Sequence, residues 1–454
     1  MGNNLGKKSG GFAFIPLLLF IVIYIVAGVA LGDFYAFPSP VALLIAIVVA
    51  FIIFKGTINE KMKDFTDGCG DENIQIMLVV YLLAGAFSSV AKAMGGVDAT
   101  VNFGLTFVPA QFLVAGLFVI ASFLGVATGT SMGTITALVP IACGVADKAG
   151  LNLPLAIAAV VGGAMFGDNL SMISDTTIAA TRTQGVEMKD KFRMNGVIAA
   201  PAALITVVLL VVFGRPETAV PLDSFSFEII KIVPYILVLG LALAGLNVFV
   251  TLTVGIASAG IIGIVGGELT VLSFGQSIYN GFVGMNEVFF LSLLVGGLSN
   301  MVTKQGGIDW LLAKIKSFIR GEKSAQFGVA ALTAAADMAT ANNTVAIIVC
   351  GPITKSISEE YKVDPRKTAS ILDIVSCIFQ GAIPWGAQLL SAGSLAALSG
   401  FVISPMEIIP LLWYQWILAA VLIVSFFVPF ADGVTKKDPW NWERGKAQSK
   451  VNKR

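Results

Sequence analysis

The chain has 454 residues, of which 56% are hydrophobic and 13% are charged. A soluble domain carries about one quarter charged residues, so this composition excludes an ordinary water-soluble fold. The formal net charge of +1 lacks the strongly basic balance of a protein that binds nucleic acid, and we expect no nucleic-acid partner.

Long apolar runs follow one another along the chain, and most approach the roughly 20 residues that a helix needs to cross a bilayer. The runs lack the two-residue alternation of membrane-spanning strands. The sequence therefore predicts an all-α integral membrane protein with about 10 to 14 membrane segments. In chain order, the segments are predicted at 12–32, 38–54, 75–94, 104–127, 130–147, 153–178, 195–213, 226–245, 247–268, 285–303, 324–340, 342–357, 368–390 and 406–430.

The placement of lysine and arginine predicts the orientation of these segments, because basic residues resist translocation. The connections at 95–103, 214–225, 269–284 and 391–405 carry a single basic residue, Arg215, and are predicted to be external. Both termini are then cytoplasmic in a multi-pass protein of the cell inner (plasma) membrane, with the lipid bilayer as partner. The basic residues predicted to be cytoplasmic are Lys7, Lys8, Lys55, Lys61, Lys63, Arg182, Lys189, Lys191, Arg193, Lys304, Lys314, Lys316, Arg320, Lys323, Lys355, Lys362, Arg366 and Lys367, with the tail from Lys436 to Arg454.

The segments divide evenly, with seven before Arg215 and seven after it, and an odd number in each half gives the halves opposite orientations. This arrangement predicts an inverted repeat. A weak internal similarity supports it, since Thr128 through Pro140 align with Thr340 through Pro352 at a constant offset. The predicted parts are a first repeat at 1–214, an external linker at 215–225, a second repeat at 226–432 and a basic cytoplasmic tail at 433–454.

Two pairs of predicted segments could turn back inside the membrane instead of crossing it. The pairs are 104–127 with 130–147 and 324–340 with 342–357, and treating either pair as a re-entrant hairpin leaves the parity of crossings unchanged. Residues 308–320 differ in kind, because apolar residues form one face and basic residues lie opposite. This pattern predicts an amphipathic helix on the cytoplasmic surface.

The densest group of polar side chains lies from Gly167 to Thr177, where seven of eleven positions are polar at the end of an apolar helix. Carboxylate, amide and hydroxyl oxygens can replace the water shell of Na⁺, and such residues also tolerate an interrupted helix. We therefore predict Na⁺ binding at Asp168, Ser171 and Asp175. The alternative is an ordinary helix end capped by Asp and Ser. The other ion- or substrate-binding residues predicted in this group are Asn169, Ser174 and Thr176.

A second polar group lies in the other half of the chain. Pro384 and Gly386 are predicted to interrupt a helix there, as paired broken helices in a transporter require. Asp373, Ser376 and Gln380 share one helical face by their spacing. The ion- or substrate-binding residues predicted in this half are Asp337, Asn342, Asn343, Thr344, Asp373, Gln380, Pro384 and Gly386, and Thr130 and Ser131 hold the matching position in the first half.

The chain has no histidine, so a proton held by a side chain near neutral pH must be carried by a carboxyl group or a lysine. Aspartate is the simpler interpretation. Arg182 follows the first polar group, and if it turned into a cavity it could hold a substrate carboxylate by a bidentate pair. Its alternative role is a cytoplasmic anchor. We expect no cofactor, with Na⁺ and H⁺ as the transported or coupling ions.

At these residues the chain resembles the NhaC-type sodium/proton antiporter family of the ion transporter superfamily. The motif Gly167-Asp168-x-x-Ser171-x-x-Ser174-Asp175-Thr176-Thr177 carries the resemblance, supported by Ile383-Pro384-Trp385-Gly386. The resemblance implies inverted repeats with broken helices and re-entrant hairpins, and transport driven by a Na⁺ or proton gradient. Two departures leave the substrate open: Met172 stands where the family usually has proline, and Gly386 stands where asparagine is common.

The sequence therefore predicts a secondary active transporter, with Na⁺/H⁺ antiport as the first hypothesis. Its partners are a small cation and, in the alternative, a small organic solute, because Na⁺-coupled symport of an amino acid or organic acid fits the same residues. An enzyme is not expected, since the chain lacks a zinc-type histidine pair and a Gly-x-Ser-x-Gly motif. A channel is a further alternative, and a homo-oligomer is left open.

Overall fold

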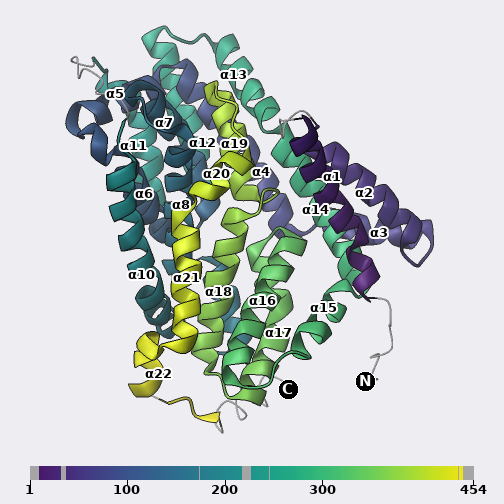
Figure 1. Ribbon diagram of the computed structural model, residues 1–454. Helices are drawn as coiled ribbons and strands as arrows, with labels where there is room; N and C mark the ends of the chain where they lie inside the picture. Colours follow the sequence, from purple (N-terminus) through teal and green to yellow (C-terminus); the bar gives the residue numbers. More distant parts are fainter. Residues whose placement is uncertain are drawn as a thin grey trace.

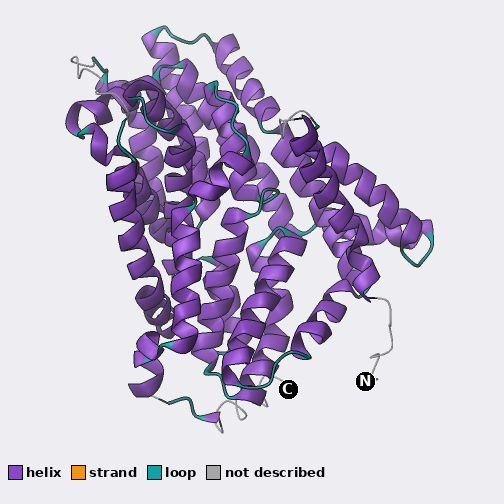
Figure 2. Ribbon diagram, in the orientation of Figure 1, coloured by secondary structure: helices purple, strands orange, loops and turns teal. Residues whose placement is uncertain are grey.

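The computed structural model describes residues 10–31, 37–172, 174–216, 226–244, 246–437 and 439–442. Within these ranges the chain is helical and contains no strand (Figure 2). Lys7 and Lys8, most of the predicted linker and the end of the predicted tail at 443–454 lie outside the described residues.

The helices of the first half come in chain order and include every predicted segment of that half (Figure 1). They are η1 (Gly10–Phe14), α1 (Ile15–Leu31), α2 (Ser39–Ile53), α3 (Ile58–Cys69), α4 (Glu72–Ala93), α5 (Gly96–Phe107), η2 (Ala110–Phe112), α6 (Leu113–Thr128), α7 (Ser131–Ala149), α8 (Leu153–Leu170), α9 (Asp175–Gln184) and α10 (Met188–Phe213).

The second half repeats the pattern of long helices joined by short turns. Its helices are α11 (Ile229–Leu243), α12 (Val248–Gly266), α13 (Val271–Gly284), α14 (Asn286–Lys304), α15 (Gly307–Lys316), α16 (Glu322–Thr340), α17 (Asn343–Tyr361), α18 (Pro365–Ala382), α19 (Ala387–Ser399), α20 (Pro405–Ile408), η3 (Ile409–Leu411), α21 (Trp413–Phe427), η4 (Pro429–Ala431) and α22 (Gly433–Lys437).

The described helices confirm an all-α integral membrane protein. Nine helical stretches among the described residues are long and apolar enough to span a bilayer, and α20 with η3 and α21, bent by 48°, would make a tenth. The amphipathic helix predicted at 308–320 is present as α15.

Three helices lie where the sequence predicted only connections, and this is a correction. α3, α5 and α13 occupy the predicted loops, and the segment predicted at 104–127 begins too early, because its first residues belong to α5. Pro109, which has no backbone N–H, separates α5 from α6. More than half of the residues in α3 and a third of those in α5 are polar, which concealed both helices from a search for apolar runs.

The centre of the molecule is formed by α8 with α9 and by α18 with α19. The most apolar windows of these two stretches are 83% and 89% buried, whereas that of α10 is 33% buried, so α10 faces outward. Glycine permits close contact around α8: a Cβ on Gly163 would lie 2.3 Å from the carbonyl oxygen of Phe118 in α6.

Two helix pairs end in tight turns beside these central helices. α6 and α7 meet at Gly129, with φ 67°, and α16 and α17 meet at Ala341, with φ 48°. The next residue in each turn, Thr130 and Asn342, caps the following helix by accepting a backbone N–H. In Figure 1 the α6–α7 pair lies in the upper half of the bundle and the α16–α17 pair in the lower half.

Candidate functional site

Both central helices are interrupted, and each interruption lies against one of the turns. α8 ends at Leu170 and α9 begins at Asp175, while α18 ends at Ala382 and α19 begins at Ala387. An interrupted helix leaves backbone groups without intrahelical partners, so side chains must supply hydrogen bonds there. The interruption predicted at Pro384 and Gly386 is therefore present, and the first polar group is interrupted as well.

Asp168 lies in the last turn of α8 and is buried, with 4% of its surface exposed. Ser131, at the start of α7, donates a hydrogen bond of 2.9 Å to Oδ2. Ser174, in the interruption, donates a hydrogen bond to Oδ1, and its Oγ lies 2.9 Å from Thr176 Oγ1. Two hydroxyl groups from separate parts of the chain thus bond to one carboxyl group, and a third, that of Thr176, contacts one of them.

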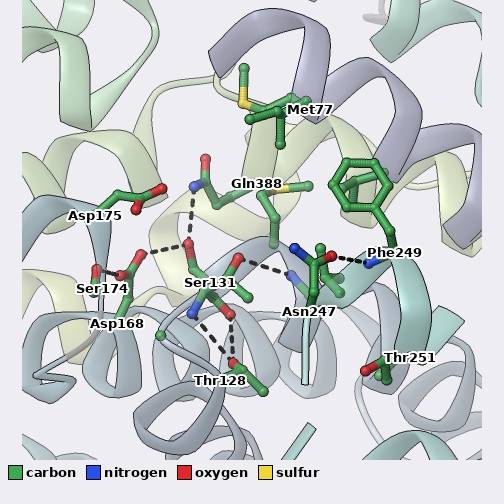
Figure 3. Close-up of a pocket in the computed structure, with 18 of the residues that line it drawn as sticks. Met77, Thr128, Ser131, Asp168, Ser174, Asp175, Asn247, Phe249, Thr251 and Gln388 are labelled. Atoms are coloured by element: carbon green, nitrogen blue, oxygen red, sulfur yellow. Dashed lines mark hydrogen bonds between the residues drawn. The ribbon is translucent and has the colours of Figure 1, made fainter. Parts of the chain in front are cut away.

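Two glutamines extend this hydrogen-bonded cluster to the second interruption. Gln388 Nε2 donates to Ser131 Oγ over 3.2 Å, so Ser131 lies between Asp168 and Gln388 (Figure 3). Gln380 Nε2 donates to Gln388 Oε1 over 2.8 Å and to the carbonyl oxygen of Ala341 over 3.1 Å. The two interruptions and the two turns are therefore joined by side-chain hydrogen bonds.

A cavity of about 370 Å³ opens onto this cluster. Asp168 and Asp175 line it from the first interruption, and Asn247, in the turn between α11 and α12, lines it from another side (Figure 3). Apolar residues of α4 and α12 complete its wall. The cavity wall therefore combines a few carboxylate, amide and hydroxyl groups with apolar side chains. This is the usual composition of a small-molecule site.

Asp373 belongs to a second cluster, on the other side of the same interruption. Lys191 of α10 lies 2.5 Å from Asp373 Oδ2, and both side chains are at most 1% exposed. Asn169 and Asn195 each donate a hydrogen bond of 2.8 Å to the same carboxylate oxygen. The Lys191 ammonium also donates to the carbonyl oxygen of Asn169 and to Thr177 Oγ1. This ion pair fixes the end of α8.

The position of Lys191 is a correction. The sequence placed it in a basic connection predicted to be cytoplasmic, but it belongs to α10 and its side chain is 1% exposed inside the helix bundle. The neighbouring Lys189 is exposed. Because both lysines belong to one run of basic residues, the sequence did not show that Lys191 is buried. A buried lysine requires a paired carboxylate, and here it has one.

The structure brings most of the predicted site residues to the cavity. Ser171 is buried beside the first interruption without lining the cavity, and Arg182 is exposed in the last turn of α9, away from it. The cavity is also not lined by Asn169, Asp337, Asp373, Pro384 or Gly386. The predicted residues that line the cavity are Thr130, Ser131, Asp168, Ser174, Asp175, Thr176, Asn342, Asn343, Thr344 and Gln380.

The described residues contain no group of three histidine, cysteine, aspartate or glutamate side chains able to hold a metal ion. A Na⁺ ion would instead rely on Asp168 with neutral hydroxyl and carbonyl oxygens, ligands that suit a hard cation. Of the predicted trio, Asp168 and Asp175 line the cavity while Ser171 does not. Na⁺ binding by these three residues stays a prediction.

Three residues of the site were missed by the sequence reasoning. Asn195 and Lys191 were hidden among charged or apolar neighbours, although their i, i+4 spacing places them on one face of α10. Asn247, at the start of α12, carries no signal beyond helix capping, since it accepts the N–H of Phe249.

Comparison with known proteins gives sequence matches over most of the chain. The sequence profile of the Na⁺/H⁺ antiporter family matches residues 9–215 and 218–429. A malate-2H(+)/Na(+)-lactate antiporter of Bacillus subtilis (strain 168) is 24% identical over 455 residues, covering 90% of this chain and 93% of that protein. The Na(+)/H(+) antiporter NhaC of Alkalihalophilus pseudofirmus is 26% identical over 414 residues, covering 84% and 88%. The crystal structure of the YdaH transporter of Alcanivorax borkumensis matches with a TM-score of 0.42 and 14% identity, covering 94% of this chain and 99% of that one.

Proposed function

The chain belongs to the Na⁺/H⁺ antiporter family, and we propose that its exchange of Na⁺ for protons takes place at Asp168. The family membership confirms the resemblance to NhaC-type antiporters that the sequence motif indicated. The observation that carries the proposal is a single carboxyl group, buried at an interrupted helix, that faces a cavity and is surrounded by hydroxyl groups.

The chemistry of exchange follows from competition for this carboxyl group. Without Na⁺, Ser131 and Ser174 donate hydrogen bonds to the two carboxylate oxygens. When Na⁺ binds, the same hydroxyl groups rotate and present their oxygen lone pairs to the ion. A proton and a Na⁺ ion neutralise the same charge and exclude each other, so the outward movement of one is coupled to the inward movement of the other.

The arrangement of the chain suggests how the site could face each side in turn. Residues 1–214 and 226–432 form inverted repeats in this proposal, each with one hairpin turn and one interrupted helix, as the structural correspondence between Thr130 and Asn342 supports. Movement of one repeat against the other would expose Asp168 to opposite sides of the membrane. Both termini then lie in the cytoplasm of a plasma-membrane protein.

Transport by the purified full-length protein in proteoliposomes tests the proposal. An imposed Na⁺ gradient should change the lumenal pH with the wild type and with Asp147→Asn, a control that removes an exposed carboxyl group at the end of α7. Asp168→Asn should abolish the change. A wild type that is folded and active in binding Na⁺ but never moves protons would refute antiport.

An organic solute is a second candidate substrate, because the cavity is larger than a Na⁺ ion needs. Its volume of about 370 Å³ would hold roughly a dozen water molecules, at about 30 Å³ each. The relative from Bacillus subtilis is named for exchange of organic acids. We propose a thermal-shift screen of carboxylic and amino acids with and without Na⁺, in which no stabilisation under either condition would exclude this candidate.

A further inference from the structure

Among the residues that the structure describes, Asp337 is a second central carboxyl group, after Asp168, without an ion pair to a basic side chain. It lies in α16, one turn before the turn at Ala341, and its side chain is fully buried. Neither carboxyl oxygen has a hydrogen-bond partner among the described residues. A buried polar group without a partner is uncommon and costly, so it requires an explanation.

The internal correspondence of the two halves shows how unusual this position is. At the offset that relates Thr130 to Asn342, Asp337 corresponds to Gly125, and Gln380 corresponds to Asp168. A Cβ on Gly125 would lie 2.9 Å from the carbonyl oxygen of Ala164. The first half therefore leaves no room for a side chain at this point, whereas the second half places a carboxyl group there.

The surroundings of Asp337 offer no compensating charge. α18 contributes the backbone of Gln380, and α17 contributes the thiol of Cys350, whose Sγ lies 3.6 Å from the carbonyl oxygen of Leu332. No lysine or arginine forms an ion pair with Asp337 in the part of the chain that the structure describes. An ionised carboxylate here would lack a cation, with the backbone of Gln380 as its nearest polar neighbour on α18, whereas a protonated carboxyl group is neutral.

A continuous series of hydrogen bonds leads from the neighbour of Asp337 to Asp168. Gln380 lies between Asp337 and the cavity, and its own Oε1 has no partner among the described residues. Its Nε2 donates to Gln388, and Gln388 donates to Ser131, which donates to Asp168. If Ser131 turned a lone pair toward Na⁺ at Asp168, its hydroxyl group would rotate and the geometry of the hydrogen bond from Gln388 would change, so the two glutamines could rearrange.

We propose that Asp337 is a second proton-binding carboxyl group of the transport cycle, which gives up its proton when Na⁺ binds at Asp168. This inference rests on the proposed function, since it needs Na⁺ to bind at Asp168. Rearrangement of Gln380 opens Asp337 to the cavity, and the proton leaves through cavity water. One Na⁺ ion then displaces one proton from Asp168 and one from Asp337, so the exchange moves net charge.

Counting the protons released on Na⁺ binding tests the proposal without requiring turnover. Calorimetry of the full-length protein with NaCl, in buffers of different ionisation enthalpy, should give about two protons per Na⁺ for the wild type and about one for Asp337→Asn. Asp337→Glu should restore about two, and Asp147→Asn, which removes an exposed carboxyl group, should leave the count at about two.

Three other results of this calorimetry would each overturn one of the two proposals. A wild-type count near one overturns the role of Asp337 and leaves antiport at Asp168 intact, and this result holds even if the variants fail to fold. An unchanged count in a folded Asp337→Asn variant also overturns it. Na⁺ binding with no proton release from the wild type would instead refute the proposed function itself.

Discussion

Replacing Lys191 by methionine should destabilise the protein strongly, because it leaves a buried carboxylate without its cation. The ammonium donates to three acceptors: Asp373 Oδ2 at 2.5 Å, the carbonyl oxygen of Asn169 at 2.8 Å and Thr177 Oγ1 at 2.7 Å. Methionine keeps a similar length but removes the charge and all three donors. Removing one partner of a buried ion pair costs about 3–5 kcal/mol of unfolding free energy.

The loss can be expressed as a shift in melting temperature. For a chain of this length the entropy of unfolding is about 1 kcal/mol per kelvin, so the apparent Tm should fall by about 3–5 °C. Tryptophan fluorescence of the detergent-solubilised protein during heating would measure the shift. Lys189→Met is the matched control, since Lys189 is exposed on the same helix, and it should leave the Tm unchanged.

The double variant Lys191→Met with Asp373→Asn separates the ion pair from simple packing. It removes both charges, while Asn169 and Asn195 can still donate to the remaining amide oxygen. Replacing a whole buried pair is often close to neutral, so most of the lost stability should return. A double variant no more stable than Lys191→Met, or a Lys191→Met variant as stable as the wild type, would refute the reasoning.

Three further changes have expected outcomes. Gly167→Ala would place a Cβ 2.5 Å from Gly125 Cα, so it should cost about 1–3 kcal/mol by overpacking and impair Na⁺/H⁺ exchange in proteoliposomes. The control is Gly116→Ala in α6, the helix that also contains Gly125; Gly116 has open space around it, so this change should do neither. Gln388→Leu removes the donor to Ser131 and should alter the apparent Na⁺ affinity measured by calorimetry, whereas unchanged affinity would contradict a coupled network. The hydrogen bond from Lys316 lowers the pKa of Glu360, so this contact between α15 and α17 is present at neutral pH and lost as the pH falls through the lowered value. The protection of α15 against hydrogen exchange, relative to the intrinsic exchange rate at each pH, should then decrease on acidification, and Glu360→Gln should remove this pH dependence.

Much of the fold could be predicted because membrane segments are specified by simple patterns. Apolar runs located the long helices, and the dense polar group after Gly167 located the first interruption, since lipid cannot accept so many polar groups. Pro384 and Gly386 located the second, because neither residue supports a regular helix. α3 and α13 were not predicted as helices, since helices that pack on the bundle surface need no continuous apolar run.

The site could be predicted only in part, because sequence shows residue types and not partners. Asp168 and Asp373 are both aspartates near interrupted helices, yet one is surrounded by hydroxyl groups at a cavity and the other is paired with Lys191. Only the packing of α10 against α18 separates their roles. The contribution of Asn247 was equally hidden, since it depends on how far the turn between α11 and α12 reaches toward Ser131.

In the proposed exchange, the balance of central charges accounts for a dependence of transport on Asp168 and Asp337 but not on Asp373. The described centre contains Asp168, Asp337 and Asp373 but one buried ammonium, that of Lys191. Asp373 takes that ammonium, so its charge is neutralised permanently and serves to hold the first interruption in place. Among the described residues neither Asp168 nor Asp337 has an internal cation, so each is neutral only while an ion or a proton from outside is bound. A protein that keeps two such groups beside a cavity maintains two positions that mobile cations can occupy, which a purely structural cluster would not require.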